Sequence, residues 1–250
     1  MYSVFMQGKQ RYCLRQLHSS DFPRHREYQR LRAKIFVDQF GWQIPVDRAG
    51  CERDRYDELD ESRVRISCVY GKRSWRGTEC LLGGVRTLIL RSWDDSMTTN
   101  EFHSTGMIPL NVIQSLKARY QENTILEITR LCLQRGSIYD PLWTGYSPTQ
   151  FHMGIARDLV YASVYELAEQ TGRYLALGIA DRYYLRVMRH SHFAFEELYT
   201  QNDGARGGYS LTMIDLSATI KAMIQSGAYD RVRRMLILCS QSNNILSRSA

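Results

Sequence analysis

The apolar residues within positions 24–39 recur every three or four places, which is the spacing of one face of a helix. This spacing places Arg32 and Phe36 one turn apart on the same face of the predicted helix. Polar residues just before the segment can cap it, and Gly41 ends it. We expect residues 1–20 to form an early strand or an extended arm.

Three segments further along have strand patterns. Residues 64–70 and 80–90 are two apolar runs separated by a turn-rich segment, so we expect them to pair as a hairpin. Residues 124–133 form another predicted strand. Gly83 and Gly84 stand side by side in the second run, and glycines inside a strand indicate a bulge or a close approach of the backbone.

The second half of the chain alternates helical and strand patterns. The clearest helix covers residues 151–170, and Gly172 stops it. The pattern predicts an α+β fold, an α/β/α sandwich with a central mixed, mostly antiparallel sheet. We expect one domain over residues 1–222 and a helical extension with a disordered tail over 223–250. The other predicted elements are helices over 110–120, 180–191, 219–225 and 231–238, and strands over 174–179, 193–198 and 208–216.

Composition is that of a globular chain. Of its 250 residues, 44% are hydrophobic and 24% charged, which suffices for a core. No apolar run approaches the roughly 20 residues that span a bilayer, and the first residues do not form a secretory signal, so we expect a cytoplasmic protein. The net charge of +7 favours acidic partners. The arginines, including the cluster at 231–234, lack the aromatic interleaving of a single-strand binder, so nucleic acid is not expected.

The cysteines and histidines do not suggest a metal site. The six cysteines form no CxxC pair, and we expect free thiols, several of them buried. His190 and His192 have no nearby ligand set. Helix capping is the expected role of Asp181, and capping or core roles are expected for His103 and His152.

Charged side chains of both signs stand in or beside the predicted elements. This set could serve an amine that attacks a thioester, because the amine must lose a proton and the carbonyl oxygen must be stabilised. Carboxylates can hold a cationic acceptor molecule, and arginines can hold its carboxylate. The charged residues are Arg32, Glu52, Asp54, Asp57, Arg86, Glu127 and Arg130.

In order and spacing these residues resemble the LuxI-type acyl-homoserine-lactone synthases. The family pattern is an Arg, a Phe four residues on, a Trp six beyond that, and E-x-D-x-x-D. A Gly-x-Arg strand, a Phe after a variable loop and a strand with E-x-x-R follow. The likeness covers residues 28–135, and a weaker likeness runs to about 222. The matching residues are Arg32, Phe36, Trp42, Glu52, Asp54, Asp57, Gly84, Arg86, Phe102, Glu127 and Arg130.

The resemblance implies the acyltransferase fold of the GNAT type, which the predicted order of elements fits. It implies an N-acyltransferase that moves an acyl chain from acyl carrier protein, or in some members acyl-CoA, to the amine of S-adenosylmethionine. The acceptor's carboxylate then closes the lactone, a quorum-sensing signal, and expels methylthioadenosine. No cofactor is implied, because S-adenosylmethionine is a substrate and the phosphopantetheine belongs to the acidic carrier protein.

The resemblance also implies roles for these residues. Glu52, Asp54, Asp57 and Arg86 would form an ionic network around the acceptor, and Phe102 would line the site. Glu127 would be the base, acting through a water, and Arg130 would brace the network. Arg32, Phe36 and Trp42 would form the acceptor-side wall. The candidate catalytic residues are Glu127, Arg130, Asp54 and Arg86, and the candidate substrate-binding residues are Arg32, Phe36, Trp42, Glu52, Asp57 and Phe102.

Three other interpretations stay open. A long-chain N-acyl amino acid synthase shares the fold and the carrier-protein donor, but Trp42 and the acidic loop favour S-adenosylmethionine. A non-catalytic module that binds acyl carrier protein would not need costly buried charges. The charged residues could also be ion pairs that only order the N-terminal region.

Two local details bear on the site. Glu127 and Arg130 are three apart on a strand, where residues three apart face opposite sides, so they share one pocket only if a bulge lies between them or the site wraps the strand. Residues 134–137 lack the spacing of the loop that binds the pyrophosphate of CoA in acetyl-CoA enzymes. This favours a carrier-protein donor.

Overall fold

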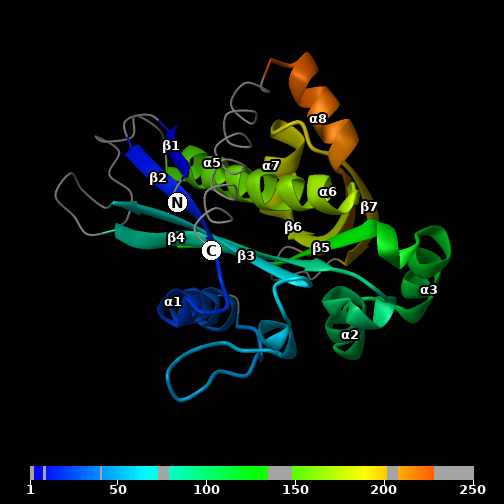
Figure 1. Cartoon of the computed structure of the whole chain (residues 1–250). Helices are drawn as coiled ribbons and strands as arrows, with labels where there is room; N and C mark the ends of the chain where they lie inside the picture. The colour runs from blue at the N-terminus through cyan, green and yellow to red at the C-terminus, as the bar shows by residue number, and fades with distance from the viewer. Residues whose placement is uncertain are drawn as a thin grey trace. The chain divides into compact units, whose positions relative to one another are not determined.

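The computed structural model describes residues 3–7, 10–39, 41–72, 79–134, 148–201 and 208–227 (Figure 1). These residues fall into two compact units. With the gaps just given, the first contains residues 3–86 and 130–163, and the second contains 87–129 and 164–227. The expected boundary at residue 222 stays a prediction, and residues 228–250 of the expected extension lie outside the described residues.

The sheet of the first unit has the strand order β1-β2-β3-β4, followed by the end of β5. The pairs β1–β2 and β2–β3 are antiparallel. The expected early strand is therefore a two-stranded hairpin, and the two predicted strands that follow the first helix lie next to each other as expected. The strands are β1 (Ser3–Gln7), β2 (Gln10–Leu17), β3 (Val64–Lys72), β4 (Glu79–Ile89) and β5 (Ile125–Leu133).

Helices cover both faces of this sheet. Figure 1 shows α1 (Phe22–Ala33) on one side of β3 and β4, and α5 (Pro148–Val160) on the other. The α1 helix continues as a π-helical turn, η1 (Lys34–Gln39). The predicted apolar face of this helix is confirmed, because Tyr28, Leu31, Ile35 and Phe36 are all buried.

The two glycines of β4 allow the close approach that the sequence predicts. A β-carbon at Gly84 would lie 2.6 and 2.7 Å from ring carbons of Tyr28. A β-carbon at Gly83 would lie 2.8 Å from the carbonyl oxygen of Cys132. Glycine at these positions therefore lets α1 and β5 come nearer to β4 than any other residue would allow.

The sheet of the second unit has the order β5-β6-β8-β7. Strands β5 and β6 are parallel, whereas β6–β8 and β7–β8 are antiparallel, with Leu175 opposite both Ile125 and Asp215. The predicted α+β class of the GNAT type, with a mixed and mostly antiparallel sheet covered by helices, is confirmed. The added strands are β6 (Leu175–Asp181), β7 (Ala194–Gln201) and β8 (Tyr209–Asp215).

Most helices of the second unit lie where the sequence predicts them, but α2 is new. Asp181 caps α7, as expected, by accepting a hydrogen bond from the backbone N–H of Tyr184 at 2.6 Å. The predicted helix over residues 151–170 is confirmed as α5, η5 and α6, whereas the one over 231–238 lies outside the described residues. The helices not yet given bounds, of which η5 begins in the first unit, are η3 (Trp93–Asp95), α2 (Met97–Ser104), α3 (Leu110–Arg119), η4 (Glu122–Thr124), η5 (Tyr161–Tyr165), α6 (Glu166–Thr171), α7 (Arg182–His190) and α8 (Leu216–Gln225).

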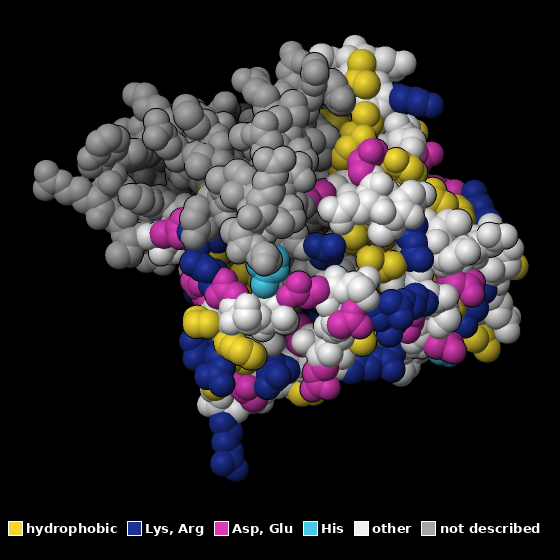
Figure 2. Space-filling view, in the orientation of Figure 1, with side chains coloured by type: hydrophobic (Ala, Val, Ile, Leu, Met, Phe, Trp, Pro, Cys, Tyr) yellow, Lys and Arg dark blue, Asp and Glu magenta, His cyan; other side chains and the backbone are white. Residues whose placement is uncertain are grey.

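Other composition-based expectations can be compared with the structure. The five cysteines within the described residues are free thiols, four of them buried. His103 and His152 each pair with a backbone carbonyl oxygen. No helix in the described part of the chain is long and apolar enough to cross a bilayer. On the face drawn in Figure 2, side chains of Lys and Arg are interspersed with those of Asp and Glu.

Candidate active site

The acidic loop after α1 has a defined local structure. Asp47 starts it by accepting hydrogen bonds from the backbone N–H groups of Ala49 at 2.8 Å and Cys51 at 3.0 Å. The loop is joined to α1 because the N–H of Glu52 donates to the carbonyl of Gln29 at 3.2 Å. This contact brings the Glu52 side chain, fully buried, under the helix.

The next two carboxylates cap a short helix and also bind arginines. Asp54 precedes η2 (Arg55–Glu58) and accepts from the N–H of Tyr56 at 3.0 Å, while Asp57 accepts from the N–H of Asp54 at 3.1 Å. This reciprocal pair is a capping box. It fixes both carboxylates relative to the backbone, so their remaining oxygen lone pairs point in set directions.

Arg32 of α1 binds two of the acids. Its Nη1 and Nη2 donate to the two oxygens of Asp57 at 2.7 and 2.8 Å, its Nη2 to the carbonyl of Glu52 at 2.9 Å, and its Nε to the Glu52 carboxylate. The Arg32 side chain is fully buried. A two-point contact of this kind is strong and directional.

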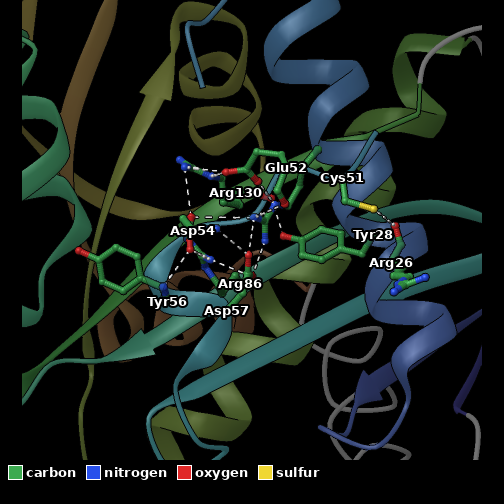
Figure 3. Close-up of polar contacts among 10 residues, drawn as sticks. Arg26, Tyr28, Cys51, Glu52, Asp54, Tyr56, Asp57, Arg86 and Arg130 are labelled. Carbon is green, nitrogen blue, oxygen red and sulfur yellow. Dashed lines mark hydrogen bonds and ion pairs between the residues drawn. The ribbon is translucent and has the colours of Figure 1, made fainter. Parts of the chain in front are cut away.

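Arg86 of β4 binds the same loop from the sheet. Its Nη1 and Nη2 donate to the two oxygens of Asp54 at 2.7 and 2.8 Å, and its Nη1 also reaches Asp57 at 3.1 Å. The ring of Tyr56 lies 5.4 Å from the Arg86 guanidinium carbon, which is cation–π range. The close-up in Figure 3 shows Arg86 beside Asp54, Asp57 and Tyr56 of the loop.

Arg130 of β5 completes the cluster. Its Nε and Nη2 donate to one oxygen of Glu52 at 3.2 and 3.0 Å, and its Nη2 lies 3.2 Å from Asp54. Its backbone φ is +53°, a left-handed conformation that costs a residue with a β-carbon about 1–2 kcal/mol. This conformation is a local departure of β5 from extended strand geometry at Arg130 itself, three residues after Glu127.

Six charged groups therefore form one neutral network, defined here as Arg32, Glu52, Asp54, Asp57, Arg86 and Arg130. Burial alone would raise the pKa of Asp54, but hydrogen bonds and charge from Arg86 hold that pKa below its usual value. Burial alone would also raise the pKa of Asp57, but hydrogen bonds and charge from Arg32 lower it below its usual value. Both acids therefore stay ionised at neutral pH, and every carboxylate of the network faces at least one guanidinium.

Aromatic rings lie beside this network. Phe36 and Trp42 stack with their ring centroids 5.0 Å apart and their planes 20° apart. The Phe36 ring also lies 5.7 Å from the Arg130 guanidinium carbon. Phe36 falls within the π-helical turn η1, a type of irregularity that is often found at functional sites.

Glu127 has different partners. It lies on the part of β5 that belongs to the second unit, and its fully buried carboxylate accepts hydrogen bonds from the backbone N–H groups of Met97 at 3.0 Å and Thr98 at 2.6 Å. Burial raises the pKa of Glu127, although the bonds from Thr98 and Met97 oppose this shift. The carboxylate thus anchors the start of α2, which also carries the buried Phe102.

The structure therefore groups the ten predicted site residues in two places. Eight of them, the network with Phe36 and Trp42, lie together in the first unit, and Glu127 and Phe102 are linked through α2 in the second. Sequence reasoning missed Tyr28 and Tyr56 as partners of the arginines. Tyr28 stands one turn before Arg32, a spacing that the sequence offered only as evidence of core packing.

No family model and no curated protein sequence matches the chain. Solved structures do. The crystal structure of the AHL synthase LasI has a TM-score of 0.60 at 16% identity, covering 85% of this chain and 92% of that one. BjaI, a CoA-dependent acyl-homoserine lactone synthase solved with SAM and isopentyl-CoA, has a TM-score of 0.54 at 16% identity, covering 90% and 98%. FeeM, an N-acyl amino acid synthase from uncultured soil microbes, has a TM-score of 0.51 at 9% identity, covering 86% and 97%.

These comparisons establish the fold. The chain has the fold of the LuxI-type acyl-homoserine lactone synthases, over most of its length and most of theirs, and the fold that the sequence resemblance implies is confirmed. Those neighbours are acyltransferases, and the FeeM likeness shows that the same fold also serves the acylation of amino acids.

Proposed function

We propose that the protein is an N-acyltransferase that makes an N-acyl-homoserine lactone from an acyl thioester and S-adenosylmethionine. One observation carries this proposal: six charged residues of the family pattern assemble into a buried ion-pair network, with Phe36 and Trp42 beside it, in a chain with the synthase fold. A network of three arginines and three carboxylates offers both signs of charge to an acceptor that carries a carboxylate and a sulfonium.

The reaction divides into two steps. A base takes a proton from the acceptor's ammonium group, and the neutral amine attacks the thioester carbonyl, forming the amide and releasing the thiol. The acceptor's carboxylate oxygen then attacks the carbon next to the sulfonium, closing the lactone and expelling neutral methylthioadenosine. In this scheme Glu127, through a water molecule, is the proton acceptor, and its raised pKa makes it a stronger base than an exposed glutamate.

Acyl carrier protein is the proposed donor. The exposed arginines Arg182, Arg186 and Arg189 recur along one face of α7, with Arg189 paired to Glu197. Such a face attracts an acidic carrier and orients its approach. Of residues 134–137, whose spacing differs from a pyrophosphate-binding loop, 135–137 lie outside the described residues. BjaI is CoA-dependent, so acyl-CoA is the alternative donor that the assay below includes.

The FeeM likeness favours a second candidate, an N-acyl amino acid synthase with the same type of donor. The two candidates differ in their acceptor. Mass spectrometry of products from the purified protein distinguishes them, with a panel of acyl carrier proteins and acyl-CoAs offered to S-adenosylmethionine, tyrosine and other amino acids. An acyl-homoserine lactone with equimolar methylthioadenosine supports the proposal. An acylated amino acid selects the second candidate, and no product with any donor refutes both.

A further inference from the structure

We propose that Tyr28 is a positioning residue: its hydroxyl holds Arg130 in the backbone conformation that directs the Arg130 guanidinium to Glu52 and Asp54. Tyr28 would act on the reaction through Arg130 and would not touch the substrate. The kinetic test rests on the function proposed above, whereas the contacts of Tyr28 and Arg130 lie within the first unit.

The left-handed backbone of Arg130 needs a contact that stabilises it. A non-glycine residue with φ of +53° is uncommon, and it is more so inside a strand. If Arg130 returned to the extended conformation, the normal alternation of β5 would turn its side chain to the other face of the sheet. The three contacts of its guanidinium with Glu52 and Asp54 therefore depend on this one backbone angle.

Tyr28 supplies a contact at that point. Its hydroxyl donates a hydrogen bond to the carbonyl oxygen of Arg130 at 2.8 Å, across 102 positions of sequence. Figure 3 shows the Tyr28 side chain reaching from α1 toward the network. A buried carbonyl that lost this donor would keep its desolvation cost, so the hydroxyl stabilises the observed backbone over the relaxed one.

The position of the Tyr28 ring depends on Gly84. Any β-carbon at Gly84 would overlap the ring, with distances of 2.6 and 2.7 Å to its carbons. Gly84 stands two residues before Arg86 on the same face of β4, so the strand that supplies one arginine of the network also makes room for the tyrosine that directs another. Tyr28 and Gly84 are thus a matched pair.

The chemistry of Tyr28 suits a permanent donor. Burial raises its pKa well above the ordinary value, so the hydroxyl is protonated at neutral pH. The ring also lies 5.3 Å from the Arg32 guanidinium carbon, in cation–π range. Tyr28 therefore contacts two arginines of the network, and its described hydrogen bond goes to a carbonyl instead of a network carboxylate.

The competing interpretation is that Tyr28 only fills the core. Tyr28→Phe separates the two, since it keeps the ring and deletes the donor. Tyr70→Phe is the matched control, because Tyr70 is also buried and its hydroxyl donates to Glu27 at 3.2 Å, outside the network. Tyr70→Phe should lower the melting temperature by about 2–4 °C, and Tyr28→Phe by at least as much, because it also weakens the contacts of Arg130.

The kinetic test compares these variants with S-adenosylmethionine as the varied substrate. We expect Tyr28→Phe to lower kcat/KM at least about tenfold through misplacement of the network, and Tyr70→Phe to stay within about twofold of the wild type. In an Arg130→Lys background the addition of Tyr28→Phe should have little further effect, because both changes disable the same group. Equal kinetics of Tyr28→Phe and Tyr70→Phe, or effects of Tyr28→Phe and Arg130→Lys that multiply, would overturn the inference.

A second readout does not need activity. The Nε–H of Arg130 and the Nε–H of Arg32 both donate to Glu52, so their hydrogen exchange can be compared by NMR in one sample. In Tyr28→Phe, exchange at Arg130 should rise at least about tenfold while Arg32 stays protected. Unchanged protection at Arg130 refutes the positioning role. A wild type that makes no lactone refutes only the proposed function.

Discussion

Replacing Asp57 by Asn tests how far the fold depends on the buried charges. Asp57 accepts hydrogen bonds from Arg32 at 2.7 and 2.8 Å, from Arg86 at 3.1 Å and from the N–H of Asp54 at 3.1 Å. Asparagine offers one acceptor oxygen and turns an NH2 group toward a guanidinium. It also leaves the network with one uncompensated positive charge.

The size of the effect follows from these contacts. Removing one partner of a buried ion pair costs about 3–5 kcal/mol. Arg32 keeps its contacts with Glu52, so we expect the lower end, about 3 kcal/mol, or roughly a hundredfold in the folding equilibrium. The assay is urea unfolding of the wild type, of Asp57→Asn and of Asp38→Asn, the same chemical change at an exposed position, which should stay within about 0.5 kcal/mol of the wild type.

The stabilising contribution of Asp57 should also depend on pH. Because the folded pKa of Asp57 is lowered, its stabilising contribution is complete above the unfolded value of about 3.9 and is lost as pH falls through the folded pKa. The difference between wild type and Asp57→Asn should be constant from pH 6 to 8 and should narrow below about pH 4. Equal stability of Asp57→Asn and Asp38→Asn, or a difference that persists unchanged at pH 3, would refute the reasoning.

Three further predictions concern β4, Glu127 and α7. Gly84→Ala should lower the free energy of unfolding by about 1–3 kcal/mol, because the new β-carbon would overlap the Tyr28 ring. Gly178→Ala, whose β-carbon would lie 3.5 Å from its nearest atom, should cost less, and equal costs would argue against the overlap. Glu127→Gln should fold but lose most turnover. It should also lose about 1–3 kcal/mol of stability, because its NH2 group would face a backbone N–H. Wild-type turnover in this variant would show that Glu127 is not the base. Arg186→Glu should raise the KM for acyl carrier protein and leave any turnover of acyl-CoA unchanged. An equal effect on both donors, or no effect on the carrier protein, would contradict docking at α7.

The order of helices and strands could be predicted from the sequence because the periodicity of apolar residues is strong. The element α2 was missed because its eight residues, Met97–Ser104, carry little periodic signal, and its start depends on the distant carboxylate of Glu127. The continuation of α1 as a π-helical turn also has no signature in spacing. Tertiary contacts decide both features.

The charged residues of the candidate site could be selected from sequence, but their pairing could not. The spacing of residues could not show that the backbone of Arg130 is left-handed. It showed only that Glu127 and Arg130 would need an irregularity between them to share one side of the strand. The Tyr28 hydroxyl was invisible as a donor because its acceptor is a backbone carbonyl far along the chain. Hydrogen bonds to backbone groups cannot be predicted from residue type, so the contacts that hold the network in place are found only in the structure.

The buried ion-pair network also has a consequence for folding kinetics. Its contacts join residues 20, 25, 32 and 78 positions apart, so the chain must close large loops before any of these charges finds a partner. Charges that are buried early without partners would be costly, so we expect the network to form after the folding transition state. Substitutions in it should then speed unfolding and leave the refolding rate nearly unchanged. The same residues proposed to bind the acceptor would thereby set how long the folded protein lasts.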